Sequence, residues 1–215
     1  MQVIAVGRRA ALVEVDDAGQ ALSLALWART RVEAEEVVPA AATVLFDGVD
    51  DLGALSRLLT GWTPAVDVPS AELVEITVVY DGPDLTVVAA AWGVGTDEVV
   101  ARHTSREYVV AFCGFAPGFA YLTVGQPGAA GREEPHVPRR DTPRAQVPAG
   151  SVALAGPWTG IYPTVSPGGW QLLGTTDATL WDQSREQPAL LPPGTRVRFR
   201  DAASPGSSTR EGAPR

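Results

Sequence analysis

The stretch from Gly114 to Gly174 constrains the fold more than any other part of this 215-residue chain. It holds three blocks rich in proline and glycine, which read GFAPGFAYL, PRRDTPRAQVPAGSV and TGIYPTVSPGGWQLLG. Proline fixes φ and glycine adopts φ values that other residues avoid, so these blocks predict loops that join short strands. Rings and hydroxyls lie between the loops, and rigid loops that carry such groups on a β scaffold commonly form binding sites. We therefore expect the functional site in this stretch.

The composition is that of a soluble globular protein, with 45% hydrophobic and 20% charged residues. No apolar run approaches the about 20 residues that a membrane-spanning helix needs. The net charge is −8 and the basic residues are scattered arginines, so we expect neither a membrane nor a nucleic acid as partner. The first ten residues lack a signal-peptide pattern and the single cysteine, Cys113, has no internal disulfide partner, so we expect a reducing, cytoplasmic location.

Missing residue types exclude several kinds of site. The chain contains no lysine, which excludes Schiff-base chemistry, a Walker-type phosphate loop and a Ser–Ser–Lys amidase centre. The two histidines, His103 and His136, and the single cysteine lack the spacing of a metal site, so we expect no metal. Cys113 stands in an apolar strand and is expected to be a buried, inert thiol.

Hydrophobic periodicity divides the chain into two parts. Residues 1–80 alternate strands with helices and predict a small α/β sandwich, with strands at 3–6, 11–15, 41–46 and 74–80 and helices at 18–29 and 50–60. Residues 81–203 begin with two helices separated at Gly93–Gly95, for which Asp84 and Thr96 are the expected N-caps. Short strands between turns follow at 108–112, 152–155, 170–174 and 196–200, the pattern of a β-barrel or sandwich. We expect the boundary at Asp81-Gly82-Pro83 and a disordered tail at 204–215.

The three blocks, in this order and spacing, resemble the family called allophanate hydrolase subunit 1, the 5-oxoprolinase B-type subunit and the sporulation-kinase inhibitor Kip. The segments PAGSV, TGIYP and SPGGWQL carry most of the resemblance, and weaker similarity in VEITVVYDGPDL and LPPGTRVRF extends it over roughly residues 1–200. The resemblance implies a cyclophilin-like β-barrel for the second part. The expected fold is therefore α+β, a small N-terminal α/β sandwich followed by that barrel.

The same resemblance implies a function at the level of a complex. It implies the B-type subunit of an ATP-dependent 5-oxoprolinase, which opens 5-oxo-L-proline to L-glutamate in a hetero-oligomer with a subunit-2 (C-like) partner and an A-like subunit. It equally admits a non-enzymatic inhibitor of a sensor histidine kinase, or a carboxyltransferase subunit of an allophanate pathway. The residues alone do not decide among these. Because lysine is absent, we expect no amidase activity from the isolated chain.

Matching the family's motifs residue by residue gives the candidate site. The expected catalytic residues are His103, Arg144 and Gln171, and the expected substrate-binding residues are Phe115, Phe119, Arg139, Tyr162, Ser166 and Trp170. His103 matches a histidine in the lead-in HTSREYVV, and its alternative is a structural residue at a helix C-terminus. Arg139 and Arg144 match the pattern P-R-x-x-T-P-R and suit a carboxylate or phosphate, unless they only pair with Asp141 to hold the loop.

The remaining motif residues carry weaker expectations. Residues 166–169 form either an anion-binding nest or a plain turn. Alternation along a strand places Gln171 on the face opposite Trp170. Trp158 stands where the family usually has glutamine, so an amide contact to a ligand is either lost or replaced by stacking. We expect Phe115, Phe119 and Tyr162, and with them Trp158, to form an exposed apolar face that binds the subunit-2 partner.

Overall fold

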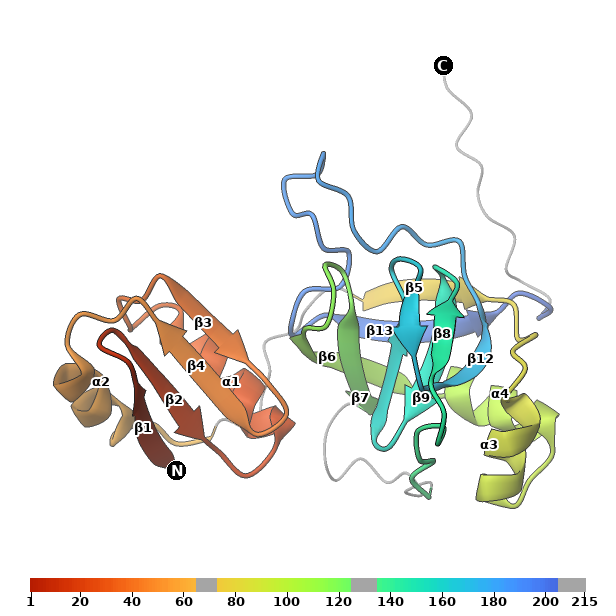
Figure 1. Ribbon diagram of the computed structural model, residues 1–215, viewed down its shortest axis with the longest axis horizontal. Helices are drawn as coiled ribbons and strands as arrows, with labels where there is room; N and C mark the ends of the chain where they lie inside the picture. The colour runs from red at the N-terminus through yellow and green to blue at the C-terminus, as the bar shows by residue number, and fades with distance from the viewer. Residues whose placement is uncertain (65–72, 125–134, 205–215) are drawn as a thin grey trace.

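The first of two units is a four-stranded antiparallel sheet in the order β1-β2-β4-β3. The computed structural model describes residues 1–64, 73–124 and 135–204, and Figure 1 shows this unit beside a larger β-barrel. Its elements are β1 (Gln2–Val6), β2 (Ala10–Glu14), α1 (Ala18–Ala28), β3 (Glu36–Pro39), β4 (Thr43–Asp47) and α2 (Leu52–Leu59). All were predicted within a few residues except β3, and the α/β sandwich is confirmed.

Local chemistry explains where the two helices of this unit begin. The Asp17 side chain accepts a hydrogen bond from the Gln20 backbone N–H at 2.8 Å, and Asp51 accepts one from Ala54 at 2.8 Å. Such N-caps satisfy donors that the first helical turn leaves open. Both helices then contribute apolar residues to one buried cluster with β2 and β4. The unit therefore has its own hydrophobic core.

The second unit is a seven-stranded sheet in the order β12-β9-β10-β7-β6-β13-β5. Its strands are β5 (Leu73–Val78), β6 (Glu107–Cys113), β7 (Ala120–Val124), β9 (Ser151–Ala155), β10 (Trp158–Ile161), β12 (Gln171–Thr175) and β13 (Arg196–Asp201). The sheet closes where Val79, just beyond β5, exchanges backbone hydrogen bonds of 2.8 and 2.9 Å with Thr175 of β12. The α+β fold with a β-barrel in its second part is confirmed.

We call the joint between residues 79–84 and β12 the seam. At the seam the two backbones approach so closely that side chains would collide. A Cβ on Gly82 would meet the carbonyl of Leu172, and one on Gly174 would meet the carbonyl of Val79. Glycine at both positions therefore permits the sheet to close.

The strand at residues 73–78 corrects one expectation. It was predicted to close the N-terminal unit, but β5 pairs in parallel with β13 over Leu73–Val78 and Arg196–Asp201. Ile76 and Val78 lie in the barrel core with Val197 and Phe199. The prediction failed because a strand of apolar alternation pairs with whichever sheet edge the fold presents, and that edge lies more than a hundred residues away in the sequence.

Two helices and a small ribbon cover the barrel. Helix α3 (Leu85–Trp92) contacts β12, and α4 (Thr96–Thr104) contacts β13. Gly93 ends α3 with a φ of 67°, a left-handed conformation that suits glycine. Strands β8 (Arg144–Val147) and β11 (Ser166–Gly168) pair with each other in the ribbon. Asp84 is the N-cap of α3 as expected, although its side chain forms no capping bond, whereas the expected cap Thr96 is wrong because Gly95 is the N-cap of α4.

Alternation along β9 separates two apolar layers. Val152 lies in the barrel core, whereas Ala153 and Ala155 belong to a second cluster with Val147 of the β8–β11 ribbon. All five residues of β9 are buried, so both faces of this strand are covered. The second layer contains the rings of the motif blocks and is where the candidate site lies.

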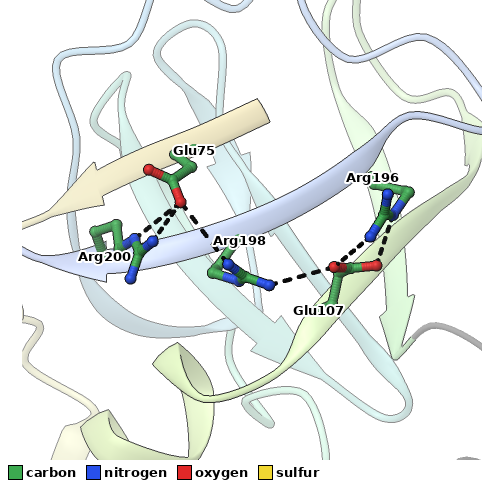
Figure 2. A network of polar contacts seen from close by, with 5 residues as sticks. All are labelled: Glu75, Glu107, Arg196, Arg198 and Arg200. Carbon is green, nitrogen blue, oxygen red and sulfur yellow. Dashed lines mark hydrogen bonds and ion pairs between the residues drawn. The ribbon is translucent and has the colours of Figure 1, made fainter. Parts of the chain in front are cut away.

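The outward face of β13 carries a network of five charged residues, which we call the outer ladder. Arg196, Arg198 and Arg200 alternate along the strand with the buried Val197 and Phe199. Glu107 receives bonds of 2.7 and 2.8 Å from Arg196, and Arg198 reaches it at 3.4 Å. Figure 2 shows the ladder, which is completed by Glu75 paired with Arg198 and Arg200. The ladder links β6, β13 and β5 on the face opposite the core.

The two units touch through α1. Ala18 at the start of α1 packs with Ala111 and Phe112 of β6, and Tyr121 and Trp158 lie against this cluster. The expected tail at 204–215 lies, apart from Ser204, outside the described residues. In the part of the chain that is described, no helix has the length and apolar character needed to cross a membrane.

Candidate functional site

A cluster of aromatic rings occupies the layer outside the barrel strands. The ring of Phe119 lies 5.3 Å from Tyr162 and 5.4 Å from Trp170, both edge to face. Tyr121 continues the cluster at 5.5 Å from Trp170. These edge-to-face contacts are favourable for aromatic quadrupoles and hold the rings in fixed positions. The structure thus brings together three expected substrate-binding residues, Phe119, Tyr162 and Trp170.

Burial corrects the expectation that these rings form an exposed face. Phe119 and Tyr162 are each only 2% exposed, and Trp158 is half-buried against Tyr121 and Phe112. Burial raises the pKa of the Tyr162 phenol, and a hydrogen bond from the Trp170 backbone opposes that rise. The prediction failed because loop sequences do not show which of their rings a covering ribbon buries. Phe119 and Tyr162 are therefore core residues of the outer layer.

Phe115 is the exposed member of the ring cluster. Its side chain is 61% exposed, and its ring lies 5.4 Å from Phe119 and 6.4 Å from Tyr162. Among the described non-glycine residues it alone has a positive φ, 69°. A left-handed backbone costs a bulky L-residue about 1–2 kcal/mol, so the surrounding loop holds Phe115 in this position against strain.

The arginines of the PRRDTPR loop converge on Asp84. The Nη2 of Arg144 donates to Asp84 Oδ1 at 2.9 Å, and the Nη1 of Arg140 reaches the same oxygen at 3.3 Å. The second oxygen, Oδ2, accepts the backbone N–H of Leu172 at 2.8 Å. We call Asp84, Arg140 and Arg144 the inner arginine cluster. The expectation that Asp141 pairs within this loop is not met, because Asp84 accepts the bonds instead.

The Asp84 carboxylate is almost inaccessible, with its side chain 3% exposed. Burial pushes its pKa upward, but the hydrogen bonds from Arg144 and Leu172 and the two guanidinium charges outweigh burial, so its pKa lies below the usual value. The carboxylate is therefore ionised at neutral pH and forms a charged link between the seam and β8. Sequence analysis missed this role, since Asp84 also stands where a helix N-cap is expected.

Arg144 lines an open hollow of about 350 Å³ along the seam. Other residues around it are Asp81, Pro83, Gln146, Ser151 and Thr175. With Nη2 bonded to Asp84, the Nη1 of Arg144 is buried and has no hydrogen-bond partner among the described residues. A buried donor without a partner is costly, and because this atom is inaccessible, a molecule in the open hollow does not reach it.

Two further polar atoms of the motif blocks are buried without a partner in the described part of the chain, Ser166 Oγ and Gln171 Oε1. Gln171 is 4% exposed, and its Nε2 donates to the carbonyl of Pro138 at 3.0 Å. Ser166 belongs to β11 and pairs with Val147 of β8. Both expected alternatives for residues 166–169, an anion-binding nest and a plain turn, are therefore wrong, because residues 166–168 form a strand.

Arg139 lies beside the ring cluster rather than in the inner arginine cluster. Its guanidinium carbon is 6.0 Å from the centre of the Trp170 ring, within cation–π range. The positive charge of Arg139 acts against the rise that burial produces in the pKa of Tyr121. Arg139 itself is exposed. It thus presents a cation at the edge of the aromatic layer.

His103 lies in the barrel interior, away from these groups. It is 2% exposed and stacks on Phe199 with ring centres 4.4 Å apart. Its Nδ1 lies 2.6 Å from the Tyr80 hydroxyl and its Nε2 3.1 Å from Thr159 Oγ1. Because Thr159 donates its own proton to the carbonyl of Ala153, Nε2 must be the protonated nitrogen and Nδ1 must accept from Tyr80.

This environment disfavours protonation of His103. Burial, and next the positive charge of Arg106, lower its pKa to about 3. None of the described contacts of His103 involves Arg144 or Gln171, so the structure does not bring the three expected catalytic residues together. Both ring nitrogens serve a buried hydrogen-bond network that joins α4 to β10 and to the seam.

The remaining reactive groups form no site. Cys113 is partly buried, its thiol donates to the carbonyl of Leu191 at 3.4 Å, and burial raises its pKa to about 11. The thiol is therefore protonated at neutral pH. Across residues 1–64, 73–124 and 135–204, no three His, Cys, Asp or Glu side chains lie close enough to hold a metal ion.

The sequence is similar to a known protein family and to several named relatives. The family model described as carboxyltransferase domain, subdomain C and D, matches residues 1–191. The B-type subunit of a 5-oxoprolinase from Escherichia coli O157:H7 is 49% identical over 152 residues, which are 69% of this chain and 67% of that protein. The corresponding 5-oxoprolinase subunit of Bacillus subtilis is 45% identical over 130 residues, 59% of this chain and 52% of that protein. The matched segments thus span about half to two thirds of these relatives.

Solved structures share the fold. The crystal structure of TTHA0988 is similar with a TM-score of 0.71 and 38% identity, covering 92% of this chain and 40% of that one. The urea carboxylase of Kluyveromyces lactis has a TM-score of 0.68 at 19% identity, covering 93% of this chain and 21% of that one. The second likeness shows the fold alone. In both proteins the matched unit is the smaller part of a longer chain.

Proposed function

Because this chain belongs to the family of carboxyltransferase domains, subdomains C and D, we propose that it acts as the B-type subunit of an ATP-dependent 5-oxoprolinase. The proposed reaction converts 5-oxo-L-proline, ATP and water to L-glutamate, ADP and phosphate. The identity of 49% to a B-type 5-oxoprolinase subunit is the observation that carries the proposal. ATP, used at the level of the complex, supplies the free energy to open a lactam, which as an unstrained amide resists hydrolysis.

Within this function, Arg144 is the residue best suited to bind the substrate carboxylate. It lines the hollow, its side chain is 22% exposed, and a guanidinium is a strong donor to carboxylates. Gln171 offers a buried acceptor, Oε1, near the same motif. His103 is better suited to a structural role than to proton transfer. Its pKa of about 3 keeps the ring neutral, and both ring nitrogens are hydrogen-bonded.

The proposal includes a C-like and an A-like subunit as partners. Phe115 supports a docking surface for the C-like partner, because an exposed aromatic ring held in a strained loop is typical of an interface anchor. Val165, three residues after Tyr162, is a second exposed apolar side chain of the motif blocks, at 62% exposure. The TTHA0988 structure supports such docking, since the matched unit there is 40% of a longer chain.

A reconstitution experiment tests the proposed function. The chain is assayed for ATP-dependent release of glutamate from 5-oxo-L-proline, alone and after co-expression with the C-like and A-like proteins of its source. We expect turnover only from the complex. Failure of a correctly assembled complex to release glutamate would overturn the function, and robust turnover by the isolated chain would overturn its dependence on partners.

A matched pair of substitutions tests the docking surface. Phe115→Asp should weaken binding of the C-like subunit, because it puts a charge into a desolvated contact. Val87→Asp is the control, since Val87 is 46% exposed but lies on α3. Size-exclusion chromatography of the co-expressed pair at micromolar concentration measures assembly. Equal elution of both variants with the partner would exclude Phe115 from the interface.

A further inference from the structure

The two edges of the N-terminal sheet differ in how they are protected. Strands β1 and β3 are its outermost strands, so each has one side without a neighbouring strand in this sheet. Backbone N–H and C=O groups on such a side can pair with another chain, and proteins commonly block them with charges, proline or a covering element. Strand β3 contains Glu36 and Pro39, and it contacts β6 of the barrel. The β3 edge is therefore protected.

Strand β1 has none of these features. Its five residues, QVIAV, include no charged residue and no proline. It pairs with β2 in one unbroken register, from Gln2 opposite Glu14 to Val6 opposite Ala10, so no bulge bends it. In the described part of the chain, β2 is the only strand that pairs with β1. Figure 1 shows β1 on the side of the unit away from the barrel, so the β1 edge is open.

The side chains along this edge are apolar and accessible. Ile4 is 36% exposed and Val6 is 46% exposed. The register places one apolar row across the open face of the sheet, and its members are Ile4, Leu12, Leu45 and Val38. An unprotected edge of apolar, β-branched residues favours the addition of a further strand.

A second copy of the chain fits this edge. Antiparallel pairing about a two-fold axis brings β1 against β1, and residues that face one another must lie on the same face of the sheet. Ile4 is the middle residue of the strand, so the register that pairs all five residues sets Ile4 opposite Ile4. Gln2 then faces Val6, and Val3 faces Ala5. No pair sets like charges opposite one another, and the apolar row continues from one copy into the next.

Charge favours the β1 edge over the opposite edge for self-association. The chain carries a net charge of −8, so two copies repel one another in general. At the β3 edge Glu36 stands opposite Asp47, and a copy placed there would bring further acids together. Strand β1 has no charge to repel its copy. Because the barrel adjoins β3, the two barrels lie at the two ends of a dimer that is joined at β1.

We propose that the chain forms a two-fold dimer by antiparallel pairing of β1 with β1 of a second copy, which joins two four-stranded sheets into one sheet of eight strands. This dimer does not depend on the proposed 5-oxoprolinase function, because it follows from the strand order, register and charge of the N-terminal unit. An interface made by one strand from each copy is small, so the dimer dissociates on dilution.

Sedimentation of the full-length chain tests the dimer. The wild type should sediment as a dimer at micromolar concentrations. Ile4→Lys should raise the dissociation constant of the dimer at least about tenfold, because two like charges then face one another across the axis. Val38→Lys is the matched control, since Val38 is 38% exposed and belongs to the same apolar row but lies on the protected edge strand. This control should leave the dissociation constant within about twofold.

A charge exchange identifies a second copy as the occupant of the edge. Ile4→Glu alone should weaken the dimer as Ile4→Lys does. An equimolar mixture of the two variants should form a mixed dimer, because opposite charges then face one another across the axis. Recovery in the mixture also shows that both variants are folded.

Several outcomes would overturn the proposal. A wild-type chain that stays monomeric up to millimolar concentration forms no such dimer. A dimer that persists in Ile4→Lys, or that weakens equally in Val38→Lys, is not joined at the β1 edge. A mixture of Ile4→Lys and Ile4→Glu that stays monomeric means that the two side chains do not face one another. A monomeric wild type whose binding to the C-like subunit is lost in Ile4→Lys alone would assign the edge to a strand of that partner instead.

Discussion

Two groups of arginines and carboxylates in this barrel use the same chemistry in different surroundings. In the inner arginine cluster the shared carboxylate, Asp84, is 3% exposed, whereas in the outer ladder the side chains of Glu107 and Glu75 are 30% and 47% exposed. All three carboxylates that face two arginines, Asp84, Glu107 and Glu75, have lowered pKa values. For Glu107 the hydrogen bond from Arg196 is the main cause, while for Asp84 burial is the largest influence and opposes the shift.

This difference decides what each group contributes. Solvent and salt screen the outer ladder, so its ion pairs add little to stability even where Arg196 binds Glu107 through two nitrogens. In the inner arginine cluster, hydrogen bonds to protein groups replace hydrogen bonds to water. The loss of one group therefore leaves a buried charge without its partner. A solvated network such as the outer ladder tolerates substitution, whereas a buried network such as the inner arginine cluster holds its side chains in one geometry. We therefore expect function to lie with the second.

The largest expected effect is on stability when Asp84 is replaced. Asp84→Ala removes the only described partner of Arg144 and leaves a mostly buried guanidinium uncompensated. Breaking a buried pair in this way costs about 3–5 kcal/mol, and the 22% exposure of the Arg144 side chain places the loss near the lower value. Urea unfolding measures it. A loss as small as that of Glu107→Ala would show that burial makes no difference between the two groups.

The next largest effect is on catalysis, and it compares one arginine of the inner arginine cluster with one of the outer ladder. Arg144→Ala should lower kcat/KM of the reconstituted complex by about 10- to 100-fold, since a hydrogen bond to a charged group contributes about 1.5–3 kcal/mol. Arg198→Ala should leave kcat/KM within about twofold, because Arg198 lies on the outward face of β13. Equal kinetics for the two variants, with assembly intact, would place the site elsewhere.

His103 adds a buried but uncharged side chain to this comparison of buried and solvated groups. Its pKa of about 3 lies below the unfolded value of about 6.5, so between these values the unfolded chain binds a proton that the folded chain does not. Stability should therefore fall as pH falls below about 6.5, by at most about 1.4 kcal/mol per pH unit. The free energy of unfolding, measured from pH 7 to pH 5, should be less dependent on pH in His103→Gln. Parallel curves for the two proteins would mean that His103 is not held neutral.

The smallest effect concerns the outer ladder. Glu107→Gln should change Tm by no more than about 2 °C at physiological salt, because exposed pairs contribute little. In low salt the difference from the wild type should grow, since screening then weakens. Thermal unfolding at two salt concentrations measures this. A large, salt-independent loss of Tm would show that the ladder is as tightly coupled as the inner arginine cluster.

Much of the fold follows from local sequence. Alternation predicts β1, β2, β4, β6, β9, β12 and β13, and capping aspartates together with helical spacing predict α1 and α2. The family resemblance placed a barrel in the second part, and the structure confirms it. Strands β3, β7, β8, β10 and β11 were missed, and in β3 the four residues mix charged, apolar and proline positions without a clear alternation.

The candidate site was predicted only in its location. Arg139 lies beside Trp170, and Phe119 lies with Tyr162, all within the stretch where the site was expected. Their exposure could not be predicted, since the β8–β11 ribbon that covers the rings forms between segments about twenty residues apart. The role of Asp84 could not be found from the sequence, because Asp141 lies within the arginine loop itself and is the nearer acid along the chain.

The sequence by itself determined the residues that form strands, the loops that carry rings and arginines, and the family to which the chain belongs. These features depend on period, backbone freedom and motif, which are local properties. Only the tertiary structure decided that residues 73–78 belong to the barrel, that His103 is buried and that Asp84 receives Arg144 across 60 residues of chain. Those outcomes depend on which distant surfaces meet, and on the burial that follows from it. That burial gives one arginine–carboxylate group a fixed geometry and leaves the other solvated.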